Sequence, residues 1–193
     1  MLQEKLKNYT VILASGSPRR QELLKTVTTD FEIRLKKIEE IYPPKLKGKQ
    51  ITDFLALLKA RAFEAELNKN DLLITSDTIV WLKNKALGKP KNYEEAFTML
   101  SKLSGKKHKV ITSVCIKNKN AEKVIHCTTK VFFKKLSNTE IDYYIKNYQP
   151  YDKAGAYGIQ EWIGKIGIRK IKGSYFNVMG LPVHKLYKEL LNL

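Results

Sequence analysis

The chain has 193 residues, of which 43% are hydrophobic, so it can bury a core without disulfides or a structural metal. No apolar run approaches the ~20 residues of a membrane-spanning helix, so we expect no membrane partner. The first five residues include a glutamate and form no apolar run, which argues against a signal peptide and favours the cytoplasm. We expect one domain over residues 1–193.

The two cysteines, Cys115 and Cys127, are too few for a disulfide framework or a zinc site. We expect them to be small buried hydrophobic side chains. The formal net charge is +17, and lysine supplies most of it. Such a charge could favour nucleic acid. The lysines are spread along the whole chain, however, without interleaved aromatic residues, so we expect solvated lysines and no nucleic-acid partner. A diffuse positive field would still attract an anionic substrate.

The first predicted elements are a strand at residues 9–14 and a helix at residues 18–27. Pro18 suits the first position of that helix, and Ser17 is placed to cap it. A second strand follows near residues 31–35. Together these segments predict a strand, a tight loop and a helix.

The middle of the chain alternates between helix and strand patterns. Apolar residues recur at helical spacing over residues 52–67, and again in a helix that begins near Tyr93. Between them, a strand that opens at Asp71 is expected to end at residues 75–78. The strand, or a hairpin partner of it, resumes at residues 79–81.

A hairpin formed by residues 108–116 and 123–133 dominates the second half. A capping box at Ser137 opens a helix, and a strand follows near residues 166–171. The last helix begins at Pro182 and is expected to bury Val183, Leu186, Tyr187 and Leu190. Because strands and helices alternate before this hairpin, we predict an α/β fold with a mixed sheet.

The loop at residues 15–20, Ser-Gly-Ser-Pro-Arg-Arg, is the first candidate for chemistry. A helix N-terminus offers unpaired N–H groups to an anion, and arginine binds phosphate oxygens in a bidentate manner. The loop fits neither the P-loop nor the dinucleotide-binding motif. Its local features favour equally an anion site and an ordinary capped helix with exposed arginines.

Other candidates are weaker when taken singly. Asp77 is predicted to end a strand, where carboxylates often face a ligand, although a turn aspartate is the commoner case. Glu39 and Glu40 could join Asp77 in holding Mg²⁺, or could lie in a solvated loop. Lys59 and Lys89 could neutralise phosphate, as any lysine could.

The glycine-rich segment at residues 155–160 is the last candidate. Its small residues would let backbone approach a ligand closely, and the amide of Gln160 could read a base edge. A tight structural turn explains the same residues.

Taken in order, these segments resemble the Maf family of nucleoside triphosphate pyrophosphatases. The resemblance covers nearly the whole chain, and each motif is weak alone whereas the ordered set is specific. It is carried by LASGSPRR (13–20), IEE (38–40), KA (59–60), SDT (76–78), GKP (88–90), LSG (103–105), DKAGAYGIQ (152–160) and GSYFNVMGLP (173–182).

The resemblance implies hydrolysis of a nucleoside triphosphate to the monophosphate and pyrophosphate, with a divalent metal, Mg²⁺ or Mn²⁺. It also implies an elongated α/β fold, in which a mixed sheet with flanking helices forms two lobes around a cleft, similar to the inosine triphosphate pyrophosphatases. Asp77 matches the family's proton acceptor, and Glu40, or less directly Glu39, an acidic residue that helps Asp77 to place the metal. The residues that match the phosphate site are Ser15, Arg19, Arg20, Lys59 and Lys89.

Specificity follows from the same resemblance. Arg20, Thr78 and Gln160 match the branch that resembles dTTP/UTP pyrophosphatases, and modified pyrimidine nucleotides are further expected substrates. A glutamine amide suits the imide edge of uracil or thymine, but a flipped amide suits cytosine equally well. The chain departs from the family at Glu161 and Trp162, where small residues are usual, and this change next to Gln160 puts base preference in question.

The alternative hypothesis is a protein that binds without catalysis and acts on septum formation, to which the family has been linked, or on nucleic acid. Retention of Asp77 favours the enzyme. The sequence does not give the oligomeric state, for which a homodimer is the working hypothesis.

Overall fold

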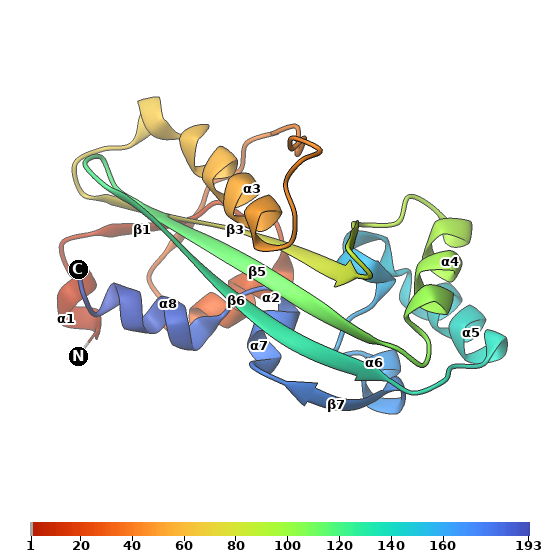
Figure 1. Cartoon of the computed structure of the whole chain (residues 1–193). Helices are drawn as coiled ribbons and strands as arrows, with labels where there is room; N and C mark the ends of the chain where they lie inside the picture. The colour runs from red at the N-terminus through yellow and green to blue at the C-terminus, as the bar shows by residue number, and fades with distance from the viewer. Residues whose placement is uncertain (1) are drawn as a thin grey trace. The chain divides into compact units, whose positions relative to one another are not determined.

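The computed structural model describes residues 2–193 and contains one seven-stranded sheet with helices beside it (Figure 1). The strands are β1 (Thr10–Leu13), β2 (Glu32–Ile33), β3 (Asp71–Leu82), β4 (Lys85–Leu87), β5 (Lys107–Lys117), β6 (Glu122–Phe133) and β7 (Ile168–Lys172). The α-helices are α1 (Leu2–Leu6), α2 (Pro18–Lys25), α3 (Lys49–Arg61), α4 (Tyr93–Leu103), α5 (Asn138–Tyr148), α6 (Trp162–Gly167), α7 (Tyr175–Met179) and α8 (Val183–Leu190). Three short 3₁₀ turns cover Glu64–Glu66, Pro150–Asp152 and Ala154–Ala156.

The sheet has the order β2-β1-β3-β5-β6-β7, with β4 paired to β3. β1 is parallel to β2 and β3, whereas β4 is antiparallel to β3 and β7 is antiparallel to β6. The predicted α/β class, with a mixed sheet and flanking helices, is therefore confirmed. Among the described residues, no helix is long and apolar enough to cross a membrane.

The chain divides into two compact units, each built from separate segments. Unit 1 comprises the chain up to Asp77 together with Thr112–Cys127 and Gly180–Leu193, and unit 2 comprises Thr78–Ile111 and Thr128–Met179. The elongated outline and the cleft between lobes stay predictions.

In unit 1, α3 packs on one face of β1, β3 and β5 (Figure 1). Ala56, Ala60 and Phe63 are spaced by one helical turn and are at most 3% exposed. They meet alternate strand residues such as Ile12 and Leu73, both 0% exposed. Burying one such side chain stabilises the fold by roughly 1.5–3 kcal/mol, and the two alanines let the helix backbone lie close to the sheet.

Figure 1 shows α2 and α8 on the side of these strands away from α3. Leu23 and Leu24 of α2 are buried, as are Leu186 and Leu190 of α8. The prediction for α8 was wrong for Tyr187, which is 37% exposed, and Val183 is only partly buried. An eight-residue helix that rests on one surface has a narrow buried stripe, and the spacing of four between its two leucines fills it.

Unit 2 has its own core beneath α4 and α5. The predicted capping box is confirmed: the Ser137 hydroxyl accepts from Glu140 N at 3.1 Å, and the Glu140 carboxylate accepts from Ser137 N at 2.8 Å. Leu100, Leu103 and Ile141 from these helices are at most 1% exposed. The core thus forms where two amphipathic helices cover one end of the long strands.

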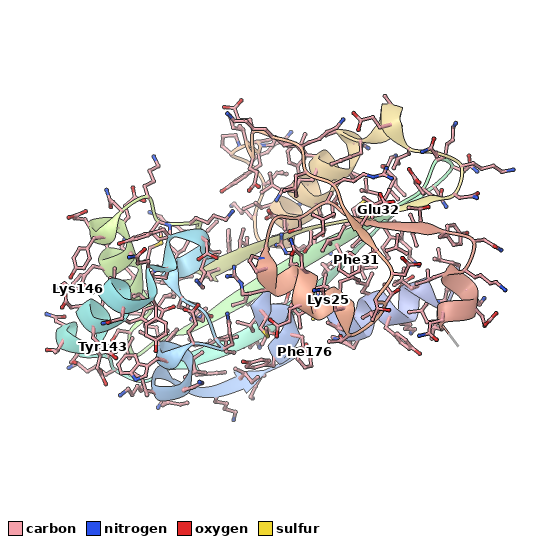
Figure 2. All side chains as sticks on the ribbon, turned by 180° about the vertical axis from the view of Figure 1, so that it is seen from behind. Lys25, Phe31, Glu32, Tyr143, Lys146 and Phe176 are labelled. Atoms are coloured by element: carbon pink, nitrogen blue, oxygen red, sulfur yellow. The ribbon has the colours of Figure 1, made fainter. Side chains whose placement is uncertain are left out.

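The positive charge lies mostly on exposed lysines, such as Lys25 and Lys146, which Figure 2 labels. Among the described residues, the two lysines that are buried are Lys117 and Lys153, and both pair with carboxylates. Both cysteines are buried and free, as predicted, and burial raises the pKa of the Cys115 thiol to about 12.

His108 is the one buried histidine of the described chain, at 2% exposure. Its Nε2 lies 2.8 Å from the Tyr157 hydroxyl, and its ring stacks on Phe133 at 5.6 Å. Its buried Nδ1 has no hydrogen-bond partner within residues 2–193. Burial therefore favours the neutral ring and lowers the pKa of His108 to about 4.

This histidine predicts a pH-dependent stability. The folded pKa of about 4 lies below the ordinary 6.5, so the unfolded chain takes up the proton first as the pH falls. The free energy of unfolding is expected to lose roughly 3 kcal/mol between pH 6.5 and pH 4 from this group. Urea unfolding of the wild type and His108→Gln across that range measures it, because the glutamine keeps a partner for Tyr157 without titrating. Equal pH slopes for the two proteins would contradict the prediction.

Candidate active site

Asp77 lies within a continuous strand, because β3 runs from Asp71 to Leu82 without a break. The prediction that Asp77 ends a strand was therefore wrong. Successive side chains of a strand point to opposite faces. Thr75 and Asp77 point to the face that α3 covers, as the 2.6 Å bond from Thr75 Oγ1 to the Ala56 carbonyl shows, whereas Ser76 points to the other face. The strand thus presents polar side chains on both faces.

On the α3 face, Lys59 brings two carboxylates together. Its Nζ donates to Asp77 Oδ1 at 2.7 Å and forms an ion pair with Glu40 Oε1 at 3.0 Å. The side chains of Lys59 and Asp77 are 13% and 8% exposed, while that of Glu40 is 44% exposed. The arrangement joins three motifs that are far apart in the sequence, and the cluster is buried on the Asp77 side and open on the Glu40 side.

Burial raises the pKa of Asp77, and the neighbouring Lys59 and Arg20 cations only partly offset it. Desolvation is the largest cause, since Asp77 as a whole residue is only 5% exposed. An aspartate of raised pKa is a better proton acceptor than an ordinary one. The ionised form of Asp77 destabilises the folded protein. Residues with such shifted pKa values are found mostly at functional sites.

On the other face, the loop of residues 15–20 is tied to the far end of the chain. Arg20 Nε donates to the Gly180 carbonyl at 2.9 Å, and the Ser76 hydroxyl donates to the same oxygen at 3.2 Å. Arg20 Nη1 lies 3.4 Å from Ser15 Oγ. Burial lowers the pKa of Arg20, with Asp77 and Glu40 opposing this effect, although the guanidinium stays charged at neutral pH.

Ser17 occupies the N-cap of α2 as predicted, but its side chain makes no capping hydrogen bond. Instead Ser15 Oγ accepts from the Ser17 backbone N–H at 3.3 Å. Ser15 is 7% exposed, and Arg19 is half-buried. The loop therefore collects a buried hydroxyl and two guanidiniums at the N-terminus of a helix, which is the donor set that phosphate oxygens accept.

The donor set for a divalent metal is present but small. Within residues 2–193, no group of three or more His, Cys, Asp and Glu side chains could hold a metal by itself. Asp77 and Glu40 each form an ion pair with the ammonium group of Lys59, so their two carboxylates lie close together. Two carboxylates with substrate phosphates form the oxygen set that Mg²⁺ prefers, so these residues fit a metal that arrives with a polyphosphate.

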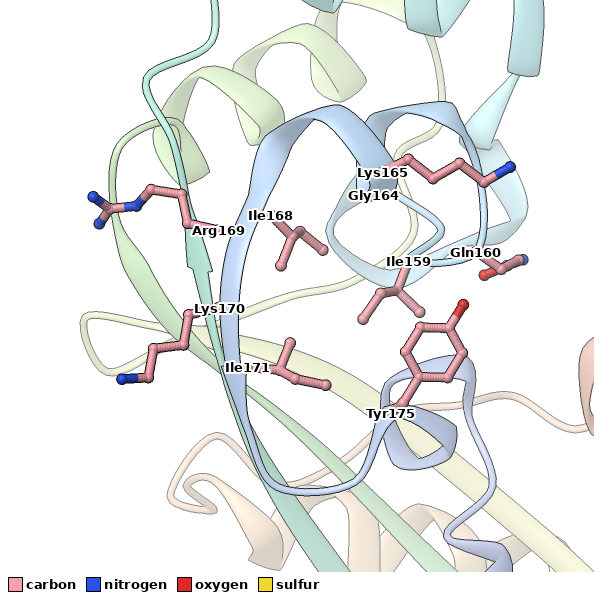
Figure 3. Close-up of a pocket in the computed structure, with 9 residues that line it drawn as sticks. All are labelled: Ile159, Gln160, Gly164, Lys165, Ile168, Arg169, Lys170, Ile171 and Tyr175. Carbon is pink, nitrogen blue, oxygen red and sulfur yellow. The ribbon is translucent and has the colours of Figure 1, made fainter.

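In unit 2, Gln160 lies at one edge of a pocket of about 380 Å³ (Figure 3). The lining combines Ile159, Ile168, Ile171 and Tyr175 with the basic residues Lys165, Arg169 and Lys170. The buried Oε1 of Gln160 has no hydrogen-bond partner among the described residues. A pocket that combines apolar and basic side chains with an unsatisfied amide is suited to a flat polar ring that supplies the missing donor.

The other predicted residues of unit 2 are Thr78 and Lys89. Lys89 is exposed and Thr78, which follows Asp77 directly, is partly buried. The loop that carries Lys89 is fixed to the glycine-rich segment, because Gly155 N donates to the Gly88 carbonyl at 2.9 Å. The structure thus brings two of the predicted motifs of this unit together through their backbones.

The sequence did not reveal the Gly180 carbonyl, which accepts from Arg20, or Ser76, which donates to the same carbonyl oxygen. Strand alternation around Asp77 would have placed Ser76 on the opposite face. No sequence signal identifies a particular carbonyl oxygen as an acceptor.

The comparisons with known proteins agree with the resemblance to the Maf family. The chain is 62% identical to the dTTP/UTP pyrophosphatase of Flavobacterium johnsoniae, over 100% of both chains. It is 60% identical to that of Flavobacterium psychrophilum, over 100% of this chain and 98% of the relative. Among solved structures, the Ham1 protein of Staphylococcus aureus shares the fold, with a TM-score of 0.55 and 17% identity over 95% of this chain and 98% of Ham1. The Maf-like protein family matches residues 10–193, and the chain belongs to that family.

Proposed function

We propose that the protein hydrolyses dTTP and UTP, and related modified pyrimidine nucleotides, to the monophosphate and pyrophosphate. The observation that carries the proposal is the buried Asp77, whose carboxylate is held by Lys59 beside Arg20 in unit 1. The names of the full-length relatives support the substrate class. We further propose that the whole chain acts as one Maf-like domain in the cytoplasm, where nucleoside triphosphates are made and used, and that it forms a homodimer.

The triphosphate is assigned to the cationic groups. Ser15, Arg19 and Arg20 would bind phosphate oxygens at the start of α2, and Lys59 and Lys89 would add charge. Attack on the α-phosphorus spreads negative charge over its oxygens, and fixed cations stabilise that charge in a dry site. The bonds from Arg20 to Gly180 and Ser15 support this role, since they hold its guanidinium before substrate arrives.

Asp77 would orient the attacking water and accept its proton. An ordinary aspartate has a pKa of about 3.9 and is a weak base at neutral pH. Burial raises the pKa of Asp77 and so improves proton transfer. Lys59, which bonds to Oδ1, fixes the carboxylate. Mg²⁺ or Mn²⁺ would be held by Asp77, Glu40 and the substrate phosphates, and would neutralise phosphate charge when bound.

Base selection is assigned to Gln160, with Thr78 and Arg20. The partnerless Oε1 of Gln160 would accept from N3–H of uracil or thymine. Cytosine presents an acceptor at N3 and would leave that oxygen unsatisfied. The isoleucine side chains of the pocket suit the faces of the ring.

A panel of pyrophosphate-release assays tests the proposal. Wild-type protein is incubated with each canonical nucleoside triphosphate and with 5-substituted uridine triphosphates in Mg²⁺. We expect the highest kcat/KM for dTTP and UTP. Folded protein that releases no pyrophosphate from any of them would contradict the activity, and a preference for purines would contradict the base assignment.

Removal of the metal is expected to abolish activity. EDTA should lower pyrophosphate release to about 1% or less of its starting rate, because the phosphate charge is then left uncompensated. Excess Mg²⁺ or Mn²⁺ should restore it. Glu40→Gln should raise the metal concentration for half-maximal rate by about tenfold, since one of two carboxylate ligands is lost. Full activity in EDTA would contradict the metal requirement.

A further inference from the structure

Gln160 lies in a tight turn within unit 2. The backbone N–H of Glu161 donates to the Gly158 carbonyl at 3.1 Å, which closes a four-residue turn with Gln160 at its third position. The carbonyl of Glu161 then accepts from Gly164 N at 3.1 Å and from Lys165 N at 3.2 Å, at the start of α6. The backbone of Gln160 is therefore held on its C-terminal side.

The carboxylate of Glu161 is held in the interior by two side chains. Its Oε1 forms an ion pair with Lys153 Nζ at 3.0 Å, and its Oε2 accepts from the Tyr144 hydroxyl. The Tyr144 hydroxyl in turn accepts from Gly158 N at 3.0 Å. Lys153 is 8% exposed and Tyr144 is 0% exposed, so these bonds are shielded from water. The carboxylate thus bridges both ends of the turn.

Close packing leaves the turn little freedom. A Cβ at Gly158 would lie 2.7 Å from Cδ of Glu161, so the carboxylate rests directly on the Gly158 backbone. A Cβ at Gly164 would lie 2.0 Å from the Ile159 carbonyl oxygen, so the residue before Gln160 is held against α6. Both neighbours of Gln160 are therefore fixed by contacts that only glycine permits.

We propose that Glu161, with Lys153 and Tyr144, is a positioning residue that fixes the Gln160 amide for base selection. The inference rests on the proposed function. A glutamine amide distinguishes uracil or thymine from cytosine only when its orientation is fixed, because the flipped amide suits cytosine. Glu161 supplies that restraint through the backbone of the turn. Loosening the turn lets the amide adopt both orientations, and discrimination falls.

The test compares kcat/KM for dTTP with kcat/KM for dCTP. In Glu161→Ala we expect the dTTP-to-dCTP ratio to fall about tenfold, the cost of one hydrogen bond. The change should appear mainly in KM for dTTP, because the base lies away from the reacting phosphorus. Glu161→Gln keeps an oxygen that accepts from Tyr144 and should restore much of the ratio. Tyr144→Phe should lower it.

Asp142→Asn is the matched control. Asp142 accepts from the Tyr93 hydroxyl at 2.6 Å and pairs with Lys146 at 2.9 Å, so it makes the same kinds of bond on the outside of α5. The dTTP-to-dCTP ratio of kcat/KM in Asp142→Asn should stay within about twofold of the wild-type ratio. An unchanged ratio in Glu161→Ala and Tyr144→Phe, with a lower Tm or equal slowing on both substrates, would overturn the proposal. Tyr144→Phe decides the outcome if Glu161→Ala fails to fold.

Binding separates this inference from the proposed function. The probes are dTTP and dCTP analogues with an imido link between the α- and β-phosphorus, titrated calorimetrically into wild type, Glu161→Ala and Tyr144→Phe. If wild type prefers the thymine analogue but releases no pyrophosphate, the proposed function fails while Glu161 is still tested. Loss of the preference in Glu161→Ala or Tyr144→Phe supports the positioning role, and an unchanged preference in both overturns it. Equal binding of both analogues by wild type overturns it.

Discussion

Asp77→Asn is expected to lower kcat for pyrophosphate release from dTTP by at least about 10²-fold, the usual contribution of a positioned proton acceptor. The asparagine keeps the shape of the side chain and an oxygen for the bond from Lys59, but neither accepts a proton nor carries charge toward a metal. Burial raises the pKa of Asp77, so wild-type activity should fall as the pH drops through that raised value. Steady-state kinetics across pH on both proteins measure the two effects.

Stability separates a chemical from a structural role for this residue. The raised pKa means that the ionised Asp77 costs the folded state free energy at neutral pH, so Asp77→Asn should unfold at the same temperature as wild type or higher. Asp71→Asn is the matched control on the same strand. Asp71 is 3% exposed and pairs with Arg34 at 3.2 Å, so this change should lower Tm and leave kcat unchanged. Normal kcat in Asp77→Asn would exclude it as the proton acceptor.

Arg20→Lys should lower kcat/KM for dTTP by between about 10- and 100-fold, the value of a charge-assisted hydrogen bond in a buried site. The guanidinium uses Nε for the Gly180 carbonyl while Nη1 reaches Ser15, which a single ammonium cannot reproduce. Kinetics with dTTP measure the loss. Arg61→Lys, which alters an exposed pair with Glu122, should have no effect, and equal rates for the two variants would contradict the role of Arg20.

The sequence predicted the hairpin of β5 and β6, the capping box and most helices, because periodicity and local chemistry decide these elements. It misread β3. Thr75, Ser76 and Asp77 look like turn residues, since short polar side chains bond to nearby backbone. In the fold each has a distant partner instead: the Ala56 carbonyl, the Gly180 carbonyl and Lys59. These tertiary partners allow the strand to continue where local preference would end it.

For the candidate site too, the sequence predicted some features and not others. The order of motifs pointed to Asp77, Arg20 and Gln160, but not to what holds them. Glu161 stood out only as a departure from its relatives, whereas in the fold it closes the turn beneath Gln160. Its partners come from α5 and from the segment before the turn, so no local pattern could have joined them.

The Gly180 carbonyl, which accepts from both Arg20 and Ser76, has a consequence for synthesis of the chain. A polypeptide is synthesised from its N-terminus to its C-terminus. Arg20 is therefore made about 160 residues before Gly180, whose carbonyl accepts its hydrogen bond. Until Gly180 has left the ribosome, the guanidinium lacks this tether. Contacts of such long sequence separation form slowly. The Arg20 guanidinium should therefore reach its fixed position for phosphate binding only late in synthesis of the chain.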